Sequence, residues 1–191
     1  MIEQIIKEMA LKVASVGFVS KSGGLMQEAN TTAGNGDVIM TLAQGAPFAS
    51  NALIDVSPDR NESAISFFRA SPTRIVRQDT YLTLRENDLT FTCWINGNKT
   101  SEEPGTSAEE MIVQALRSYR VPIGEGSPIR MAEIEYLGDN TGEQINRWGW
   151  ENKMLRYNEA PHRLFQHRFK ITYAVATGCY SQTVHVLNPA C

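Results

Sequence analysis

The segment Phe165–Ala176, FQHRFKITYAVA, is the stretch that most constrains the fold of this chain. Bulky side chains alternate with polar or small ones through all twelve residues, which is the pattern of a β-strand with one face in a core and the other in water. The inward set is Phe165, His167, Phe169, Ile171, Tyr173 and Val175. A helix would scatter these side chains over its circumference, so the segment predicts a strand that needs a covering layer.

The length and composition fit one globular domain. The chain has 191 residues, of which 42% are hydrophobic and 20% are charged. A disordered chain would carry fewer apolar residues or more net charge, and two ordinary domains would need a longer chain. The net charge of -3 opposes any attraction of the whole protein to nucleic acid. We therefore expect a single domain spanning 1–191.

The three cysteines and the N-terminus bear on where such a protein is made. Cys93, Cys179 and Cys191 are too few and too widely spaced for a disulfide framework or a paired-cysteine metal site. Acids at Glu3 and Glu8 argue against a signal peptide, and no apolar run is long enough to span a bilayer. These features predict synthesis in a reducing cytoplasm and no membrane contact.

Two amphipathic helices are expected to cover the sheet. Apolar residues recur at three- and four-residue steps over residues 1–14. Ser107 and Glu110 have the spacing of a capping box, which opens a second helix that runs to Tyr119. Further strands are expected at residues 16–20, 38–42, 53–56, 64–69 and 129–137, the last with Ala132, Ile134 and Tyr136 inward. The fold class is α+β, with a mainly antiparallel sheet packed by an N-terminal helix and a central helix.

Three segments are harder to place. Residues 22–37 are rich in glycine, asparagine and threonine, which predicts a long mobile loop. The inward face of residues 80–96 changes phase across Arg85–Asp88, which favours a hairpin turn at residues 86–88, with a β-bulge as the alternative. Residues 138–161 form an insertion that contains Trp148 and Trp150, which must pack on this chain or on a neighbour.

No catalytic, cofactor or metal site is predicted. The glycine-rich stretches lack the spacing of phosphate-binding loops, and no serine occupies a nucleophile elbow. His162 and His167 could be imagined as metal ligands, but a hydrogen-bonded core histidine and a loop histidine are the simpler interpretation. Cys93 alternates with Phe91 and Ile95 as a small core residue rather than as a nucleophile.

The remaining candidates are surface residues that could contact another subunit or line a channel. They are Trp94, Trp148, Trp150, Arg156, Arg168 and Lys170. Arg168 and Lys170 share the outer face of the best strand, where a subunit or a nucleic-acid backbone could approach, or only solvent. Trp94 either contacts a partner or packs inside the chain. An acidic block at residues 125–143 precedes a basic block at residues 147–170. Two such blocks are usually solvated faces, but they also suit head-to-tail contact between identical subunits.

The order of these elements resembles that of tail-terminator and neck-ring proteins of tailed bacteriophages. The matching pieces are residues 1–14, 82–96, 107–119 and 165–176, and the phrase Leu89–Asn96, LTFTCWIN, is similar to one in neck proteins of the crAss-like phages. The pieces cover under a third of the chain, and none is a catalytic motif. Segments 22–64 and 138–161 depart from the shortest members of that family.

This resemblance implies a structural virion protein that is assembled in the host cytoplasm. It would form a homo-oligomeric ring of twelve or six copies in the neck, around the DNA channel. Its partners would be portal, adaptor or tail proteins, with possible non-specific contact to channel DNA. A non-viral adaptor that binds a peptide at a sheet edge, and a small hydrolase with a loop-gated site, remain as alternatives.

Overall fold

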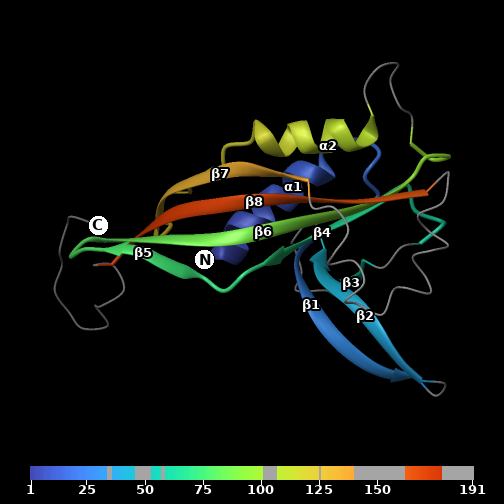
Figure 1. Ribbon diagram of the computed structural model, residues 1–191, viewed down its shortest axis with the longest axis horizontal. Helices are drawn as coiled ribbons and strands as arrows, with labels where there is room; N and C mark the ends of the chain where they lie inside the picture. The colour runs from blue at the N-terminus through green and yellow to red at the C-terminus, as the bar shows by residue number, and fades with distance from the viewer. Residues whose placement is uncertain are drawn as a thin grey trace.

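The computed structural model describes residues 1–33, 36–45, 53–56, 59–100, 107–124, 126–139 and 162–177. These residues form two helices and an eight-stranded sheet (Figure 1). The helices are α1 (Ile2–Ala14) and α2 (Ala108–Arg117). The strands are β1 (Lys21–Ala33), β2 (Gly36–Gly45), β3 (Leu53–Asp55), β4 (Ala64–Ala70), β5 (Arg74–Gln78), β6 (Leu82–Asn96), β7 (Ile129–Asp139) and β8 (His162–Ala176).

The sheet is mixed but mostly antiparallel, so the expected α+β class is confirmed. Its strand order is β3-β2-β1-β4-β6-β8-β7, and β5 pairs with β6 outside this path. Only the β1–β4 pair is parallel among these strands. The β1–β2 hairpin curves away from the rest of the sheet (Figure 1).

The long strands β6 and β8 form the axis of the sheet. They pair without interruption from Leu82↔Ala176 to Asn96↔His162. The predicted strand at residues 165–176 is therefore confirmed and begins three residues earlier. β4 and β5 lie one after the other along the outer side of β6, and β7 lies along the outer side of β8. We call β5, β6, β8 and β7 the four-stranded half of the sheet.

Both helices pack on one face of the sheet, as their apolar stripes predict. α1 buries Ile5, Ile6, Met9, Ala10 and Val13, and α2 buries Ala108, Ile112, Val113 and Leu116. The backbone N–H of Glu110 donates to Oγ of Ser107 at 3.2 Å, which confirms Ser107 as the N-cap.

The main core lies between these helices and the inward side chains of β6 and β8. Phe91 is fully buried and contacts Phe68 and Phe165, with ring centroids 5.0 and 6.3 Å apart. The alternation predicted for residues 165–176 supplies the buried residues Phe169, Ile171 and Tyr173. On β7, Ala132, Ile134 and Tyr136 pack against the same core, as expected.

A second, smaller cluster lies on the opposite face of the sheet, beneath β2 and β3. It consists of Ala43, Val56, Ile65, Phe67 and Trp94. Trp94 is only 2% exposed, and its ring stacks on His162 at 5.2 Å between centroids. The expectation that Trp94 offers a surface to a partner is therefore wrong for the folded chain. The alternative, that Trp94 packs inside the chain, is the one observed.

The predicted hairpin turn at residues 86–88 is wrong, because β6 continues straight through them. Thr83 and Asn87 point to the same side as Leu89 and Phe91 and are 4% and 1% exposed. Leu82 points to the other side and is 39% exposed. Polar residues thus occupy the buried face along the first half of β6. The apolar pattern therefore changes phase although the strand is regular.

The N-terminal segments also differ from expectation. No strand forms at residues 16–20, where the chain turns, with N of Val19 donating to O of Val16 at 2.9 Å. Within the segment 22–37, expected to be a mobile loop, residues 22–33 belong to β1 and residues 36–37 begin β2, and the two strands pair from Gly23↔Gly45 to Ala33↔Gly36. Their backbones supply the hydrogen bonds of a hairpin that glycine-rich composition does not reveal. The strands predicted at residues 38–42, 53–56, 64–69 and 129–137 are confirmed as parts of β2, β3, β4 and β7.

Candidate functional site

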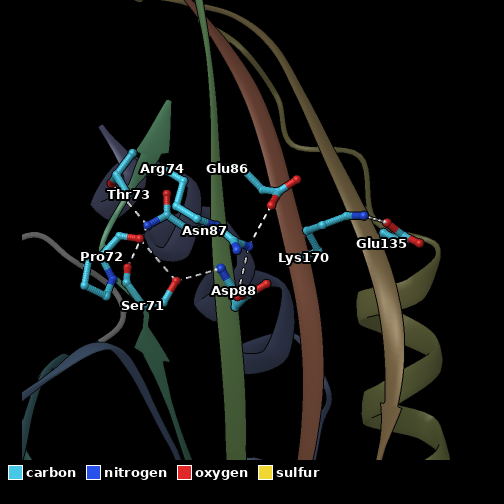
Figure 2. Close-up of polar contacts among 9 residues, drawn as sticks. All are labelled: Ser71, Pro72, Thr73, Arg74, Glu86, Asn87, Asp88, Glu135 and Lys170. Carbon is cyan, nitrogen blue, oxygen red and sulfur yellow. Dashed lines mark hydrogen bonds and ion pairs between the residues drawn. The ribbon is translucent and has the colours of Figure 1, made fainter. Parts of the chain in front are cut away.

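The outer face of the four-stranded half carries a row of charges that alternate in sign from strand to strand. We call this surface the polar face. Arg74 on β5 contacts Glu86 and Asp88 on β6, with Nη2 2.7 Å from Oε1 and 3.1 Å from Oδ2. Lys170 on β8 pairs with Glu135 on β7. Figure 2 shows these residues on one side of the strands, with the helices behind. The row therefore reads basic, acidic, basic, acidic from β5 to β7.

The position of Lys170 within this row explains its electrostatics. Its hydrogen bond and charge contact with Glu135 raise the pKa of the Lys170 ammonium above its ordinary value, and Glu86 and Asp88 add to the effect. The side chain is 32% exposed, so solvent screens the pairing. We therefore expect this ion pair to add little to the free energy of unfolding.

A buried asparagine anchors the connection between β4 and β5 at the edge of the polar face. Nδ2 of Asn87 donates to O of Ser71 at 2.8 Å and to Oγ1 of Thr73 at 3.1 Å (Figure 2). The Ser71 hydroxyl accepts from the backbone N–H of Asp88 at 2.9 Å. Because Asn87 is 1% exposed, these bonds satisfy the NH2 group of a buried amide and fix where β5 begins, whereas its Oδ1 has no hydrogen-bond partner among the described residues.

Arg168 is exposed and lies beside a shallow hollow of about 420 Å³ next to the charge row. Thr90 separates Arg168 from Arg69, since Thr90 pairs with both residues across the sheet. Ser71, Asp88 and Leu137 also line the hollow. Two guanidinium groups thus flank one hydroxyl, with a single carboxylate nearby. The predicted placement of Arg168 and Lys170 on one outer face is confirmed.

The helix-covered face holds an ionisable cluster that contains His167. Nδ1 of His167 lies 2.9 Å from Oδ1 of Asp139 and 3.1 Å from the hydroxyl of Tyr136. On the other side of the ring, Nε2 lies 3.1 Å from Oε1 of Glu109, without the angle of a hydrogen bond. His167 is 3% exposed. The interpretation of His167 as a hydrogen-bonded core histidine is therefore confirmed. The expectation of a loop histidine is wrong for His162, which is the first residue of β8 and stacks on Trp94.

Two arginines complete this cluster at its exposed rim. Nη2 of Arg163 lies 2.7 Å from Oε2 of Glu109, and the guanidinium of Arg117 lies 3.6 Å from the centre of the Tyr136 ring. The hydroxyl of Tyr136 donates to Oδ1 of Asp139 at 2.6 Å, which is the main reason that the pKa of Asp139 is lowered. The cluster joins α2, β7 and β8.

The chemical capacity of this cluster is limited. Glu109 and Asp139 approach opposite sides of the imidazole, so they do not converge on one ion, and the described residues contain no group of metal-ligating side chains. The Ser107 hydroxyl caps α2, and burial raises the pKa of the Cys93 thiol well above its ordinary value. Within the described ranges, no nucleophile, base and orienting group come together.

Several predicted interface residues cannot be placed. Trp148, Trp150 and Arg156, and most of the basic block, lie outside the described residues. In the described part, the acidic block meets β8 of its own chain through Glu135 with Lys170 and Asp139 with His167. Part of the charge complementarity expected between subunits is therefore satisfied within one chain.

Sequence reasoning missed the acids that surround His167. Glu109 lies in the first turn of the expected second helix, and Asp139 lies at the start of the expected insertion at residues 138–161. The available signal was a histidine at an inward strand position, which needs polar partners when buried. Nothing in the sequence identified those partners, because they are 58 and 28 residues away.

No helix among the described residues has the length and apolar character required to cross a membrane. Comparisons with protein-family models, with curated proteins and with solved structures found no match.

Proposed function

We propose that this protein is a structural virion component that forms a homo-oligomeric ring in the neck of a tailed bacteriophage, around the DNA channel and next to portal, adaptor or tail proteins. The role is non-enzymatic and needs no cofactor. The proposal combines the order of elements, which resembles tail-terminator and neck-ring proteins, with the surfaces that the folded chain leaves open.

The open edges of the four-stranded half carry the proposal. Among the described residues, β5 pairs only with β6 and β7 only with β8. Unpaired backbone N–H and C=O groups on edge strands are templates for another strand, and monomeric proteins usually protect them. All five residues of β5 are exposed on both sides, which is unusual for a strand that serves only its own chain.

The charges of the polar face bear on contact with DNA. Acids balance most of its basic residues, so the face as a whole holds little excess positive charge. Arg69 and Arg168 line the hollow on either side of Thr90. We propose these two arginines for any non-specific contact with channel DNA, and such contact should weaken steeply with salt.

Electron microscopy of the purified protein, alone and coexpressed with the portal and tail proteins of the same genome, tests the proposal. The expected result is closed rings with a central opening, either free or attached to the portal or tail. Failure to form rings and to join any of those partners would contradict it.

The same open edges favour a second candidate, an adaptor domain that accepts a partner peptide as an added strand. Such a domain would remain a monomer and would bind an extended peptide along β5 or β7. Single, unassembled particles that nevertheless capture a partner segment would favour this candidate over the ring.

A further inference from the structure

The two edges of the four-stranded half are matched in apolar exposure. On β5, Ile75 and Val76 are 60% and 55% exposed. On β7, Met131 and Leu137 are 47% and 41% exposed. Exposed apolar side chains on an open edge strand favour association with another strand.

The two edges are opposite in charge on the same face of the sheet. Arg74 pairs with Glu86 and Arg77 with Leu84, so both arginines point to the polar face. On β7, Glu133 pairs with Thr172 and Glu135 with Lys170, which places both acids on that face as well. One edge of the polar face is therefore basic and the other acidic.

The two charges on the β5 edge have the same spacing as the two charges on the β7 edge. Glu133 and Glu135 are two residues apart, as expected for neighbours on one face of a strand. Arg74 and Arg77 are three apart, but a register irregularity between Ile75 and Arg77 takes up the extra residue. Each edge therefore presents two like charges on the same side, one strand period apart.

The strand directions allow the two edges to meet. β5 is antiparallel to β6, β6 to β8 and β8 to β7, so β5 runs opposite to β7. A second copy placed beside the first in the same orientation would bring its β7 antiparallel to β5. The register that sets Arg74 across from Glu135 also sets Arg77 across from Glu133.

We propose that β5 of one subunit pairs antiparallel with β7 of the next, through Arg74 and Arg77 on one edge and Glu133 and Glu135 on the other, so that neighbouring subunits share a continuous sheet. The alternating row from β7 to β5 then repeats in each subunit without placing like charges together. The contact joins two different surfaces, so it propagates head to tail and closes into a ring when the rotation per subunit divides a full turn. This inference rests on the proposed self-assembly and names its interface.

Arg77 and Glu133 provide the clearest test. Neither has an ion-pair partner among the described residues, so reversing either charge leaves the pairs inside the subunit intact. The variants are Arg77→Glu and Glu133→Lys, and Lys12→Glu on α1 is a control with the same charge change as the first. Mass by light scattering is recorded over a wide concentration range, and circular dichroism verifies folding.

We expect each edge variant to need at least a tenfold higher concentration for assembly than the wild type and the Lys12→Glu control. A mixture of Arg77→Glu with Glu133→Lys should recover association, because the reversed charges attract at the mixed contact.

The outcomes separate this inference from the ring proposal. Assembly that survives both reversals would overturn the β5–β7 interface and leave the ring proposal in place. A wild type that stays monomeric over the whole range would also overturn this interface, and the ring proposal would then be decided by microscopy with portal and tail proteins.

Discussion

His167 and Asp139 lie in contact at the far end of the β7–β8 pair, with Nδ1 of the imidazole 2.9 Å from Oδ1 of the carboxylate. Glu109 at the start of α2 approaches the opposite side of the ring at 3.1 Å. One buried side chain thus ties the central helix to the edge strand that we propose as an interface. Its loss should affect the placement of both elements.

Replacement of this histidine should destabilise the fold. His167→Ala removes the contact to Tyr136 and Asp139 and leaves a void beneath α2. We expect the free energy of unfolding to fall by about 2 kcal/mol, the scale of a lost buried polar contact. Urea denaturation measures it. Arg163→Ala removes only an exposed ion pair to Glu109 and should cost under about 1 kcal/mol. Equal losses in the two variants would contradict the structural role of His167.

The lowered pKa of Asp139 predicts a specific dependence of stability on pH. A carboxyl whose pKa is lower in the folded state stabilises the fold above its ordinary pKa of 3.8. This contribution disappears as pH falls through the lower folded-state pKa. Asp139→Asn should therefore flatten the loss of unfolding free energy below pH 3.8, and by a small amount because the side chain is 65% exposed. If the variant lost stability below pH 3.8 as steeply as the wild type, the lowered pKa of Asp139 would be contradicted.

Gly23 should not tolerate a side chain. A Cβ added there would lie 2.7 Å from Cβ of Ala43 and 3.1 Å from Cγ1 of Val56, where β1 crosses the second cluster. We expect Gly23→Ala to lower the free energy of unfolding by about 1–3 kcal/mol through overpacking. Gly17→Ala is the matched control, since nothing lies within 4 Å of its added Cβ. Equal stability of the two variants would contradict the close approach of these strands.

Cys93 should be unreactive in the folded protein. Burial raises the pKa of its thiol well above the ordinary value, so almost no thiolate forms near pH 8. In a Cys179→Ser/Cys191→Ser background, a thiol reagent should label Cys93 only after denaturant is added. Fast labelling without denaturant would show that the core around Phe91 and Phe165 opens readily.

The sequence predicts a helix or strand most reliably where one face of that element is continuously apolar. β8 and α1 were identified because their patterns hold over twelve or more residues. β6 was misread as a hairpin because Thr83 and Asn87 occupy its buried face, and polar residues carry no inward signal. Residues 22–37 were misread because a hairpin depends on cross-strand hydrogen bonds, and their composition favours loops.

The candidate site was predictable only in part, for a related reason. Arg168 and Lys170 were placed on one outer face because alternation along β8 requires it. The acids that surround Lys170 on β6 and β7 follow from the register of these strands, which local pattern does not encode. For the same reason, the sequence did not reveal that Glu109 and Asp139 contact His167. It also did not reveal that the β5 and β7 edges match in charge.

Light scattering of the wild-type protein, alone and with coexpressed portal or tail proteins, gives its mass in solution and so tests whether it forms a ring. We expect an assembly of six or twelve copies of the 21.3 kDa chain, free or on its partner. A monomer that also joins none of those proteins would contradict it.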